Sequence, residues 1–465
     1  MKTAFEWDRE LYVNAVPKVV DEDEQTWRSA FQVEKAEALS TRLLWGSNVP
    51  GSFAPERVLV GGIQAMVTMG YDMTEAEKLI PEAIKAREEH DSITLGMLTA
   101  RVFHLVNTAK KIPDHPYWKY HYYNTFEEYA SAVTFPEAKP VDTESKDFFD
   151  RTHAGWLTQI IGAALGTCIE GYTSTALKNH FGEITDYPRK PNTYNDDITF
   201  ELAVLEAFRK KGYEMEPADI AEHWVGMIPT GWSAEDIALK NFKLGIYPPE
   251  SAVRSNPWRE WIGAQMRAAI CGMIAPGDAR LAAELAWRDG CISHVNNGIL
   301  GEIFNAVMVS LAYVETDIRT VLEKAMSIIP KDSEYFHVID FAYKSCLAHD
   351  NYMDAWLPCE EEFKAYNWIH AYPNAAAEVV ALYFAGNDFD KCLNYISMMG
   401  EDCDCNAAQI ANIYGCMFGH DCIDSHWSDP IGDDLLTFVR GYEKLTITEL
   451  AKRTVDAVNA AKAKK

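Results

Sequence analysis

The chain has 465 residues, of which 48% are hydrophobic, so it can bury a large core. Its formal net charge of -26 at pH 7 argues against binding to nucleic acid or to an anionic membrane surface. Its first residues lack the apolar core of a signal peptide, and no apolar run reaches membrane-spanning length. Ten cysteines are too few for a disulfide framework in a chain of this length, so we expect a reduced, cytoplasmic protein.

Helical periodicity dominates the sequence, and alternating strand-like runs are short and few. In "DMTEAEKLIPEAIKAREEHD", Thr74 and Glu77 have capping-box spacing, although Pro81 interrupts the helix that follows. The aromatic stretch "PDHPYWKYHYY" offers either a stacking surface for a sugar or base or ordinary packing. Residues 134–146 combine prolines with charges and indicate a linker. We therefore expect an N-terminal helical segment and linker over 1–145, and a second domain over 146–465.

A glycine-rich helix is expected in "HAGWLTQIIGAALGTCIEGYT". Gly162 and Gly166 lie four residues apart, on one face of the helix, where they allow another backbone to approach closely. Glu170 follows at the end of this segment. It is either a solvent-facing acid or, near metals, a general acid or base.

The segment "YNDDITFELAVLEAFRKKGY" predicts a helix that begins with acids and ends at Gly212. Asn195, Asp196 and Asp197 crowd its start. Such residues are favoured helix caps and suit the positive end of the helix dipole, so a purely structural role is one explanation. Metal binding is the other.

In "AELAWRDGCISHVNNGILGE", His294 is either a core or capping histidine or a ligand-binding residue. Asn296 and Asn297 could equally serve a turn.

Two aspartates alternate with two cysteines in "MGEDCDCNAAQIANIYGCMFG", just before another expected helix. Cys403 and Cys405 are separated by one residue and have no second Cys/His pair, which disfavours zinc. Asp402 and Asp404 offer oxygen ligands, which suit Mg²⁺, Mn²⁺ or Ca²⁺. If this helix start faces the one at Asp196, the concentrated negative charge requires divalent cations, and a pair of metals is the usual arrangement.

These segments occur in a familiar order. "AGWLTQIIGAALGTCIEGY", "NDDITFELAVLEAF", the central stretch "EWIGAQMRAAICGMIAPGDARLAAELAWRDGCISHVNNGILGEIFNAVMV" and "MGEDCDCNAAQIANIYGCMFG" resemble four ordered motifs of the ADP-ribosylglycohydrolase family. The resemblance covers roughly residues 154–427. It implies an all-α, orthogonally packed multi-helix domain, here with an additional N-terminal helical segment.

The resemblance also implies a binuclear site with two divalent cations, magnesium first, with manganese or calcium as alternatives. Its implied ligands are Asn195, Asp196, Asp197, Asp402, Asp404 and Cys405. Glu170 matches the family's acid beside the metals, and His294, with Asn296 and Asn297 next to it, matches the ligand groove. Asn195, Ile198 and Cys405 depart from threonines that the family's motifs carry, and a neutral thiol is a poor magnesium ligand. The sequence therefore indicates a divergent member.

The expected function is that of a glycosidase: metal-dependent cleavage of a ribosyl bond in a small-molecule or protein-linked ADP-ribose conjugate. The same metal site could instead act on a neutral furanoside or nucleoside, and the protein could also be a non-catalytic, crystallin-like binding protein. No nucleic-acid or membrane partner is expected, and the sequence does not indicate an oligomeric state.

Overall fold

The computed structural model describes residues 1–464; Lys465, the last residue of the expected second domain, lies outside them. The N-terminal part contains α1 (Ala4–Val13), α2 (Trp27–Trp45), β1 (Ser47–Asn48), β2 (Pro55–Glu56), α3 (Val58–Thr68), β3 (Tyr71–Asp72), α4 (Thr74–Glu77), α5 (Ile80–Glu88), α6 (Ser92–Thr108), β4 (Lys110–Lys111) and α7 (Phe126–Ala132).

The remainder contains α8 (Lys146–Gly166), β5 (Tyr172–Thr173), α9 (Ser174–Phe181), α10 (Asp196–Lys211), α11 (Pro217–Met227), α12 (Ser233–Lys243), α13 (Ala269–Met273), α14 (Ala279–Gly290), α15 (Asn297–Ala312), α16 (Ile318–Ser327), α17 (Glu334–Ala348), α18 (Tyr352–Glu362), α19 (Ala371–Ala385), α20 (Phe389–Met399), β6 (Gly400–Glu401), α21 (Cys403–Phe418), α22 (Ser425–Ser428), β7 (Asp434–Leu436), β8 (Lys444–Thr446) and α23 (Ile447–Lys462). Short 3₁₀ helices are η1 (Glu22–Glu24), η2 (Pro116–Lys119), η3 (Gly212–Glu214), η4 (Glu250–Ala252), η5 (Gln265–Arg267) and η6 (Gly419–Cys422).

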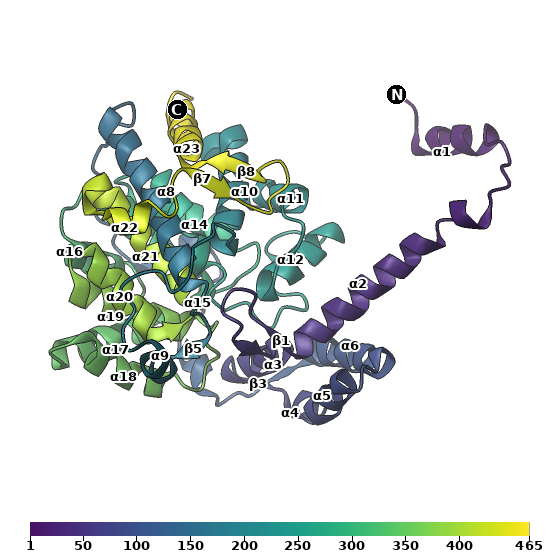
Figure 1. Ribbon diagram of the computed structural model, residues 1–465, viewed down its shortest axis with the longest axis horizontal. Coiled ribbons are helices and arrows are strands. Elements are labelled where there is room, and N and C mark those ends of the chain that lie inside the picture. Colours follow the sequence, from purple (N-terminus) through teal and green to yellow (C-terminus); the bar gives the residue numbers. More distant parts are fainter. Residues whose placement is uncertain (465) are drawn as a thin grey trace.

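The all-α prediction is confirmed (Figure 1), because the strands form only two-stranded ribbons between helices. The ribbons are β1–β2, β3–β4, β5–β6 and β7–β8, all antiparallel. Among the described residues, no helix is both long and apolar enough to cross a membrane.

Local sequence signals set several of the helix ends. The predicted helix after Asn195 is confirmed: α10 begins with two aspartates and ends at Gly212, whose φ of 62° suits glycine. The capping-box prediction at Thr74 is wrong. Thr74 is already helical in α4, and the helix breaks before α5, which starts with Pro81 in its first turn. Proline has no N–H and is tolerated there, so the chain forms two helices instead of one.

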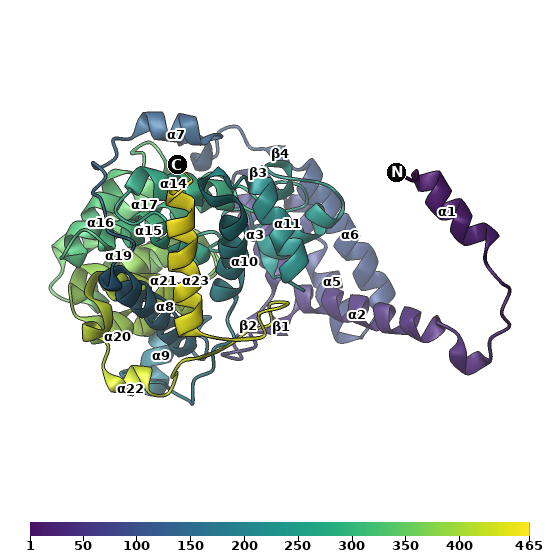
Figure 2. The same ribbon diagram turned by 90° about the horizontal axis from the view of Figure 1, so that it is seen from above.

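Helices α8 and α21 pack antiparallel along their lengths, with Gly155 against Cys416 at one end and Gly166 against Asp404 at the other, and lie side by side in Figure 2. A Cβ at Gly162 would overlap with the backbone of Ala407, and one at Gly166 would overlap with the backbone of Asp404. The expectation of close backbone approach at these glycines is therefore confirmed. The short ribbon β5–β6 ties the chain after α8 to the chain before α21, pairing Tyr172 with Glu401.

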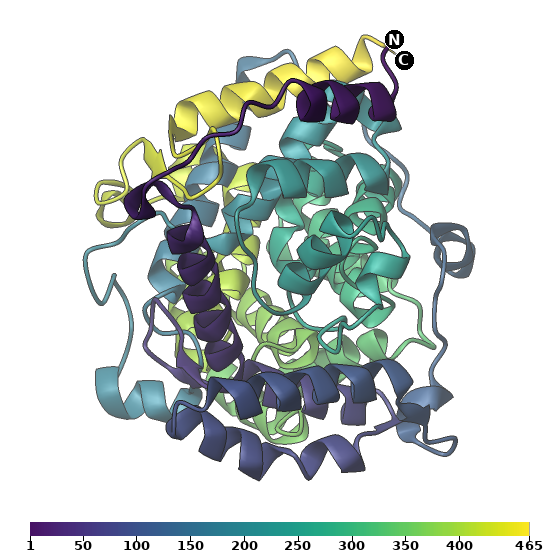
Figure 3. The same cartoon turned by 90° about the vertical axis from the view of Figure 1, so that its right-hand side faces the viewer.

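The N-terminal helices α3 to α6 form one edge of the body, and α2 extends from it with α1 at its far end (Figures 1 and 3). Neither α1 nor the first half of α2 contains a buried residue. In contrast, the chain between β1 and β2 packs on the second part, where the Tyr172 hydroxyl donates a hydrogen bond to the Ser52 carbonyl (3.1 Å). The predicted linker, 134–146, is irregular up to the start of α8.

Candidate metal centre

The start of α10 holds the first pair of carboxylates. The Asn195 side chain caps this helix by accepting a hydrogen bond from the Asp197 backbone N–H (2.9 Å). The cap fixes the first turn, so that Asp196 and Asp197 both lie at the end of the helix that carries partial positive charge. Asp197 is completely buried, which is unusual for a residue that serves only as a cap.

The start of α21 holds the second pair. Gly400 and Glu401 both have positive φ, 77° and 61°, and turn the chain sharply from the β ribbon into the helix. Asp402 occupies the cap position, and its backbone N–H donates to the Asn374 side chain (3.0 Å). Asp404 follows in the first turn. Both carboxylates are buried.

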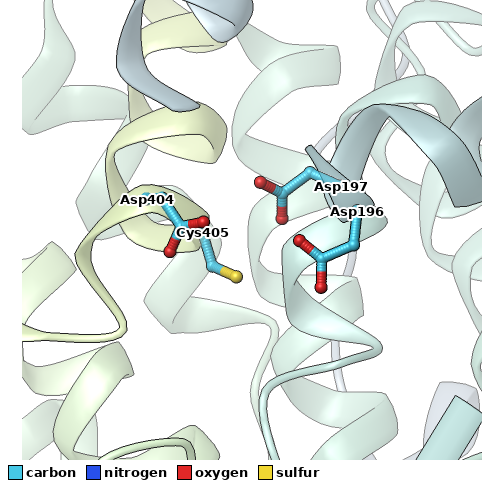
Figure 4. Close-up of side chains that lie close together, drawn as sticks. All are labelled: Asp196, Asp197, Asp404 and Cys405. Atoms are coloured by element: carbon cyan, nitrogen blue, oxygen red, sulfur yellow. The ribbon is translucent and has the colours of Figure 1, made fainter. Parts of the chain in front are cut away.

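The two helix starts face each other (Figure 4), so the predicted meeting of the acid clusters is what the structure has. Ligand atoms of Asp196, Asp197, Asp404 and Cys405 all lie within 4.8 Å of one another. A second group, Glu170, Asp402 and Asp404, meets the same criterion. Asp404 belongs to both groups and so connects them.

Buried carboxylate oxygens without partners show that these residues fit a metal ion. Both side-chain oxygens of Asp197 and Oδ1 of Asp404 are buried and have no hydrogen-bond partner among the described residues. A buried ionised carboxylate is strongly unfavourable unless it is paired or coordinates a cation. Carboxylate oxygens, which make up the second group and all of the first except the Cys405 thiol, suit hard divalent cations, and the clusters could therefore hold them.

Burial is the main cause of the abnormal acidity of these groups. It raises the pKa of Asp196 to about 7, with the nearby Asp404 charge adding to the effect. The pKa values of Asp197 and Asp402 are also raised, first by burial and then by neighbouring carboxylates. Burial likewise raises the pKa of Asp404, although hydrogen bonds with Asp402 and Glu170 oppose the shift. Without cations, the cluster thus favours proton uptake.

Glu170 lies just after α8, where its backbone N–H still bonds to the Gly166 carbonyl (3.0 Å). Burial, followed by the charges of Asp404 and Asp402, raises the pKa of Glu170 well above its usual value. The side chain is 9% exposed, so it is not a solvent-facing acid. It lies with Asp402 and Asp404 in the second carboxylate group; its role as an acid or base stays a prediction.

The two cysteines differ in position, as expected. The Cys403 thiol points to the Gly166 carbonyl (3.6 Å) and belongs to neither group. Cys405 belongs to the first group and lies 3.6 Å from the Met266 sulfur. Burial and then the charge of Asp197 raise the pKa of the Cys405 thiol well above its usual value, so the thiol stays neutral and is a weak ligand for a hard cation.

The amide of Asn195 is divided between two tasks. Its oxygen caps α10, and its nitrogen donates to Oδ2 of Asp404 (3.2 Å). The residue therefore joins the two helix starts directly. Direct ligation of a cation by Asn195 stays a prediction.

His294, Asn296 and Asn297 are buried and belong to neither carboxylate group. The Nδ1 of His294 pairs with the Ser293 hydroxyl (2.8 Å), and its Nε2 has no hydrogen-bond partner among the described residues. Asn296 and Asn297 both donate to Glu260, at 3.4 and 3.2 Å. The structure thus places the two amides at another buried carboxylate. Their role in substrate binding stays a prediction.

Sequence reasoning missed a buried ionic network beside His294. The Arg267 guanidinium binds Asp289 at 2.6 Å and Glu235 at 3.2 Å, and it donates to the Ser293 hydroxyl. Burial raises the pKa of Glu235 to about 7, although Arg267 opposes the shift. The available signal was an arginine in the middle of the apolar run "QMRAAICGMI". This network joins η5 to α12 and α14.

A family model described as ADP-ribosylglycohydrolase matches residues 144–463. The chain therefore belongs to the ADP-ribosylglycohydrolase family, a family of hydrolytic enzymes, and the resemblance seen in the motifs is confirmed. Among solved structures, one described as an ADP-ribosylglycohydrolase-related protein complex is 17% identical, with a TM-score of 0.49. The match covers 68% of this chain and 99% of that one. No curated protein matches at a significant level.

Proposed function

We propose that the protein is a metal-dependent glycosidase that cleaves a ribosyl glycosidic bond, in an ADP-ribose conjugate or a related riboside. The observation that carries the proposal is the set of buried, unpaired carboxylate oxygens on Asp197 and Asp404, with Glu170 in the adjoining group. Structural caps need no such oxygens, whereas a hydrolytic metal site does. Membership of a hydrolase family supports the same reading.

The carboxylates at the two helix starts would hold two divalent cations, with magnesium as the first expectation. Such cations bind vicinal hydroxyls and polarise a sugar or water when present. Asp404 belongs to both groups and would be the shared ligand. The α8–α21 contact and the Asn195 cap hold these side chains in their buried positions.

Glu170 would hold the proton that the reaction moves. Its carboxyl group lies with Asp402 and Asp404, where it would donate a proton to a leaving oxygen or nitrogen. After that transfer, the carboxylate can take a proton from water. Proton transfer of this kind contributes roughly 10²–10⁴ in rate.

One cavity is connected to the Glu170 segment through a single lining residue, Trp368. This cavity, of about 620 Å³, is lined by Arg57 from the N-terminal part and by Trp368, among others. The Trp368 ring lies 3.4 Å from the position that a Cβ on Gly171, the residue after Glu170, would occupy. We propose that this cavity receives the group attached to the ribose, which is either a protein side chain or a small molecule.

The test is hydrolysis of ADP-ribosyl-arginine, ADP-ribosyl-serine and a panel of neutral furanosides and nucleosides, with and without EDTA. We expect EDTA-sensitive turnover of an ADP-ribosyl substrate. Turnover of neutral furanosides alone would assign the alternative substrate class. Absence of turnover on every substrate, with metal bound, would favour a crystallin-like binding protein.

Replacing Glu170 by Gln tests the proton-transfer role. We expect kcat to fall by roughly 10²–10⁴ while metal binding is kept, because Gln has similar size but cannot transfer the proton. Glu401→Gln is the matched control, since Glu401 lies in the adjoining β ribbon and belongs to neither carboxylate group. Unchanged turnover in Glu170→Gln would show that another group moves the proton.

A further inference from the structure

A second cavity, of about 510 Å³, lies where η2 and the β3–β4 ribbon meet the chain after η4. None of the residues that line it belongs to the two carboxylate groups. Its volume is within the range of small-molecule sites. Most of its wall is aromatic and comes from Tyr71, Tyr117, Trp118, Tyr120 and Tyr122.

The cavity contains a buried arginine without an acidic partner. Arg259 is 6% exposed, and among the described residues no carboxylate oxygen lies within 4.0 Å of its guanidinium. Its Nη1 donates to the Asn256 carbonyl (2.9 Å) and contacts the Met66 sulfur (3.4 Å). Nε and Nη2 have no hydrogen-bond partner in the described part of the chain, and neither is among the fully buried side-chain atoms. These two donors are therefore accessible and can pair with an anion that enters the cavity.

The nearest acid is already engaged elsewhere. Glu260, the next residue along the chain, accepts hydrogen bonds from the Tyr117 hydroxyl (2.7 Å) and from the amides of Asn296 and Asn297. Burial is the main cause that raises the pKa of Glu260, and Arg259 opposes the shift only in part. The remaining guanidinium donors of Arg259 are therefore available to a ligand.

A second cation lies at the same cavity. The Lys111 ammonium lies 4.1 Å from the centre of the Trp118 ring, and the Arg259 guanidinium lies 5.4 Å from the centre of the Tyr71 ring. Tyr71 and Trp118 in turn meet edge to face at 5.5 Å. Both cations and both rings line the same cavity, so two positive charges face one aromatic wall.

We propose that this cavity binds a small organic anion that carries a planar ring, such as a mononucleotide or an aromatic carboxylate. The guanidinium of Arg259 pairs with the phosphate or carboxylate, since its fork matches either group. The aromatic wall packs against the ring. The site is separate from the carboxylate clusters, so the inference does not depend on the proposed function.

The experiment is isothermal titration of the full chain in EDTA, which keeps metals away from the carboxylate clusters. The probes are AMP, benzoate, adenosine and inorganic phosphate. We expect AMP or benzoate to bind about tenfold or more tightly than both adenosine, which lacks the anion, and phosphate, which lacks the ring. Tighter binding of AMP would indicate a phosphate ligand, and tighter binding of benzoate would indicate a carboxylate ligand.

Variants locate the site. With the preferred probe, Arg259→Gln should weaken binding about tenfold or more, and Lys111→Gln several-fold, because each removes one cation. Lys110→Gln is the matched control, since Lys110 is the preceding residue of β4 but does not line the cavity. Glu170→Gln should also leave the affinity unchanged. If Arg259→Gln does not fold, Lys111→Gln against Lys110→Gln decides the question.

Three results would overturn the inference. The first is absence of binding by both ring-bearing anions at millimolar concentration. The second is binding of adenosine or phosphate that is as tight as the binding of AMP or benzoate. The third is a probe whose binding is lost in Glu170→Gln, or whose affinity changes equally in Lys111→Gln and Lys110→Gln. Such a probe would occupy another site.

Discussion

At the scale of single residues, the protein keeps several carboxyl groups in places where ionisation is unfavourable. Asp197 and Asp404 have buried oxygens without partners, and Glu201 holds together three helices through hydrogen bonds from Gln159 (2.9 Å) and Gln409 (3.2 Å). The same physical cause, burial, acts on both kinds of group. The consequences differ, because Asp197 and Asp404 belong to the groups that could hold a cation and Glu201 does not.

Replacing Asp197 by Asn separates stability from metal binding. Without metal, we expect the variant to be more stable than the wild type, because Asn is neutral, whereas Asp197 must either bury a charge or take up a proton when the chain folds. With millimolar Mg²⁺, the wild type should gain about 3 kcal/mol at 100 times Kd, and the variant much less. Melting temperatures with and without Mg²⁺ measure this. An equal Mg²⁺ effect in both proteins would exclude Asp197 as a ligand.

The pH dependence of stability should change in Glu201→Gln. Burial raises the pKa of Glu201 to about 8, whereas an unfolded chain has a value of about 4.3. Between these values the folded state binds more protons, so its free energy of unfolding falls as the pH rises, by at most about 1.4 kcal/mol per pH unit.

Urea unfolding of Glu201→Gln at pH 5 and pH 8 measures this effect. We expect a smaller loss of stability between the two pH values than in the wild type. Glu127→Gln, on the exposed side of α7, controls for the loss of one charge. A loss as large as that of the wild type would mean that Glu201 is ionised in the folded protein.

At the scale of elements, the antiparallel packing of α8 against α21 positions the site. Glu170 follows α8, and Asp402 and Asp404 begin α21, so the distance between the acids depends on how closely the two helices approach. Glycines make this approach possible, and the β5–β6 ribbon fixes the same end of the pair.

Gly166→Ala should therefore disturb both stability and metal binding. A Cβ at this position would overlap with the Asp404 backbone, and we expect a loss of about 1–3 kcal/mol together with weaker Mg²⁺ binding. Gly96→Ala is the control, because that helical position in α6 has no atom within 4 Å of a new Cβ. Urea unfolding and Mg²⁺ titration compare them. Normal metal binding in Gly166→Ala would show that the metal site tolerates a greater distance between α8 and α21.

At the scale of the whole molecule, the N-terminal part has two different relations to the rest. Helix α1 contains no buried residue, while the chain around Ser52 packs at the end of α8 next to the site. A Cβ on Gly51 would overlap with the carbonyl of Thr167. We therefore expect the second region, and not the first, to shape access to the site.

Truncation tests this division. Deletion of residues 1–25 should leave the melting temperature and turnover nearly unchanged, since these residues bury nothing.

Replacing residues 49–53 by a Gly/Ser linker of equal length should change the preference among glycoside substrates. Thermal unfolding and kcat/KM on the substrate panel provide the measurements. A linker variant with wild-type preference would show that this loop does not restrict entry.

The sequence by itself determined the helices, the family and the two acid clusters, because caps, glycine spacing and acids at helix starts are local signals. Tertiary structure alone decided that Asp404 belongs to both carboxylate groups, that Asn296 and Asn297 bond to Glu260, and that an arginine and aromatic side chains line a second cavity. The physical reason is burial. Whether a charge has a partner depends on side chains that come from distant parts of the chain, and Arg259 and Asp197 differ from ordinary surface charges only in what surrounds them.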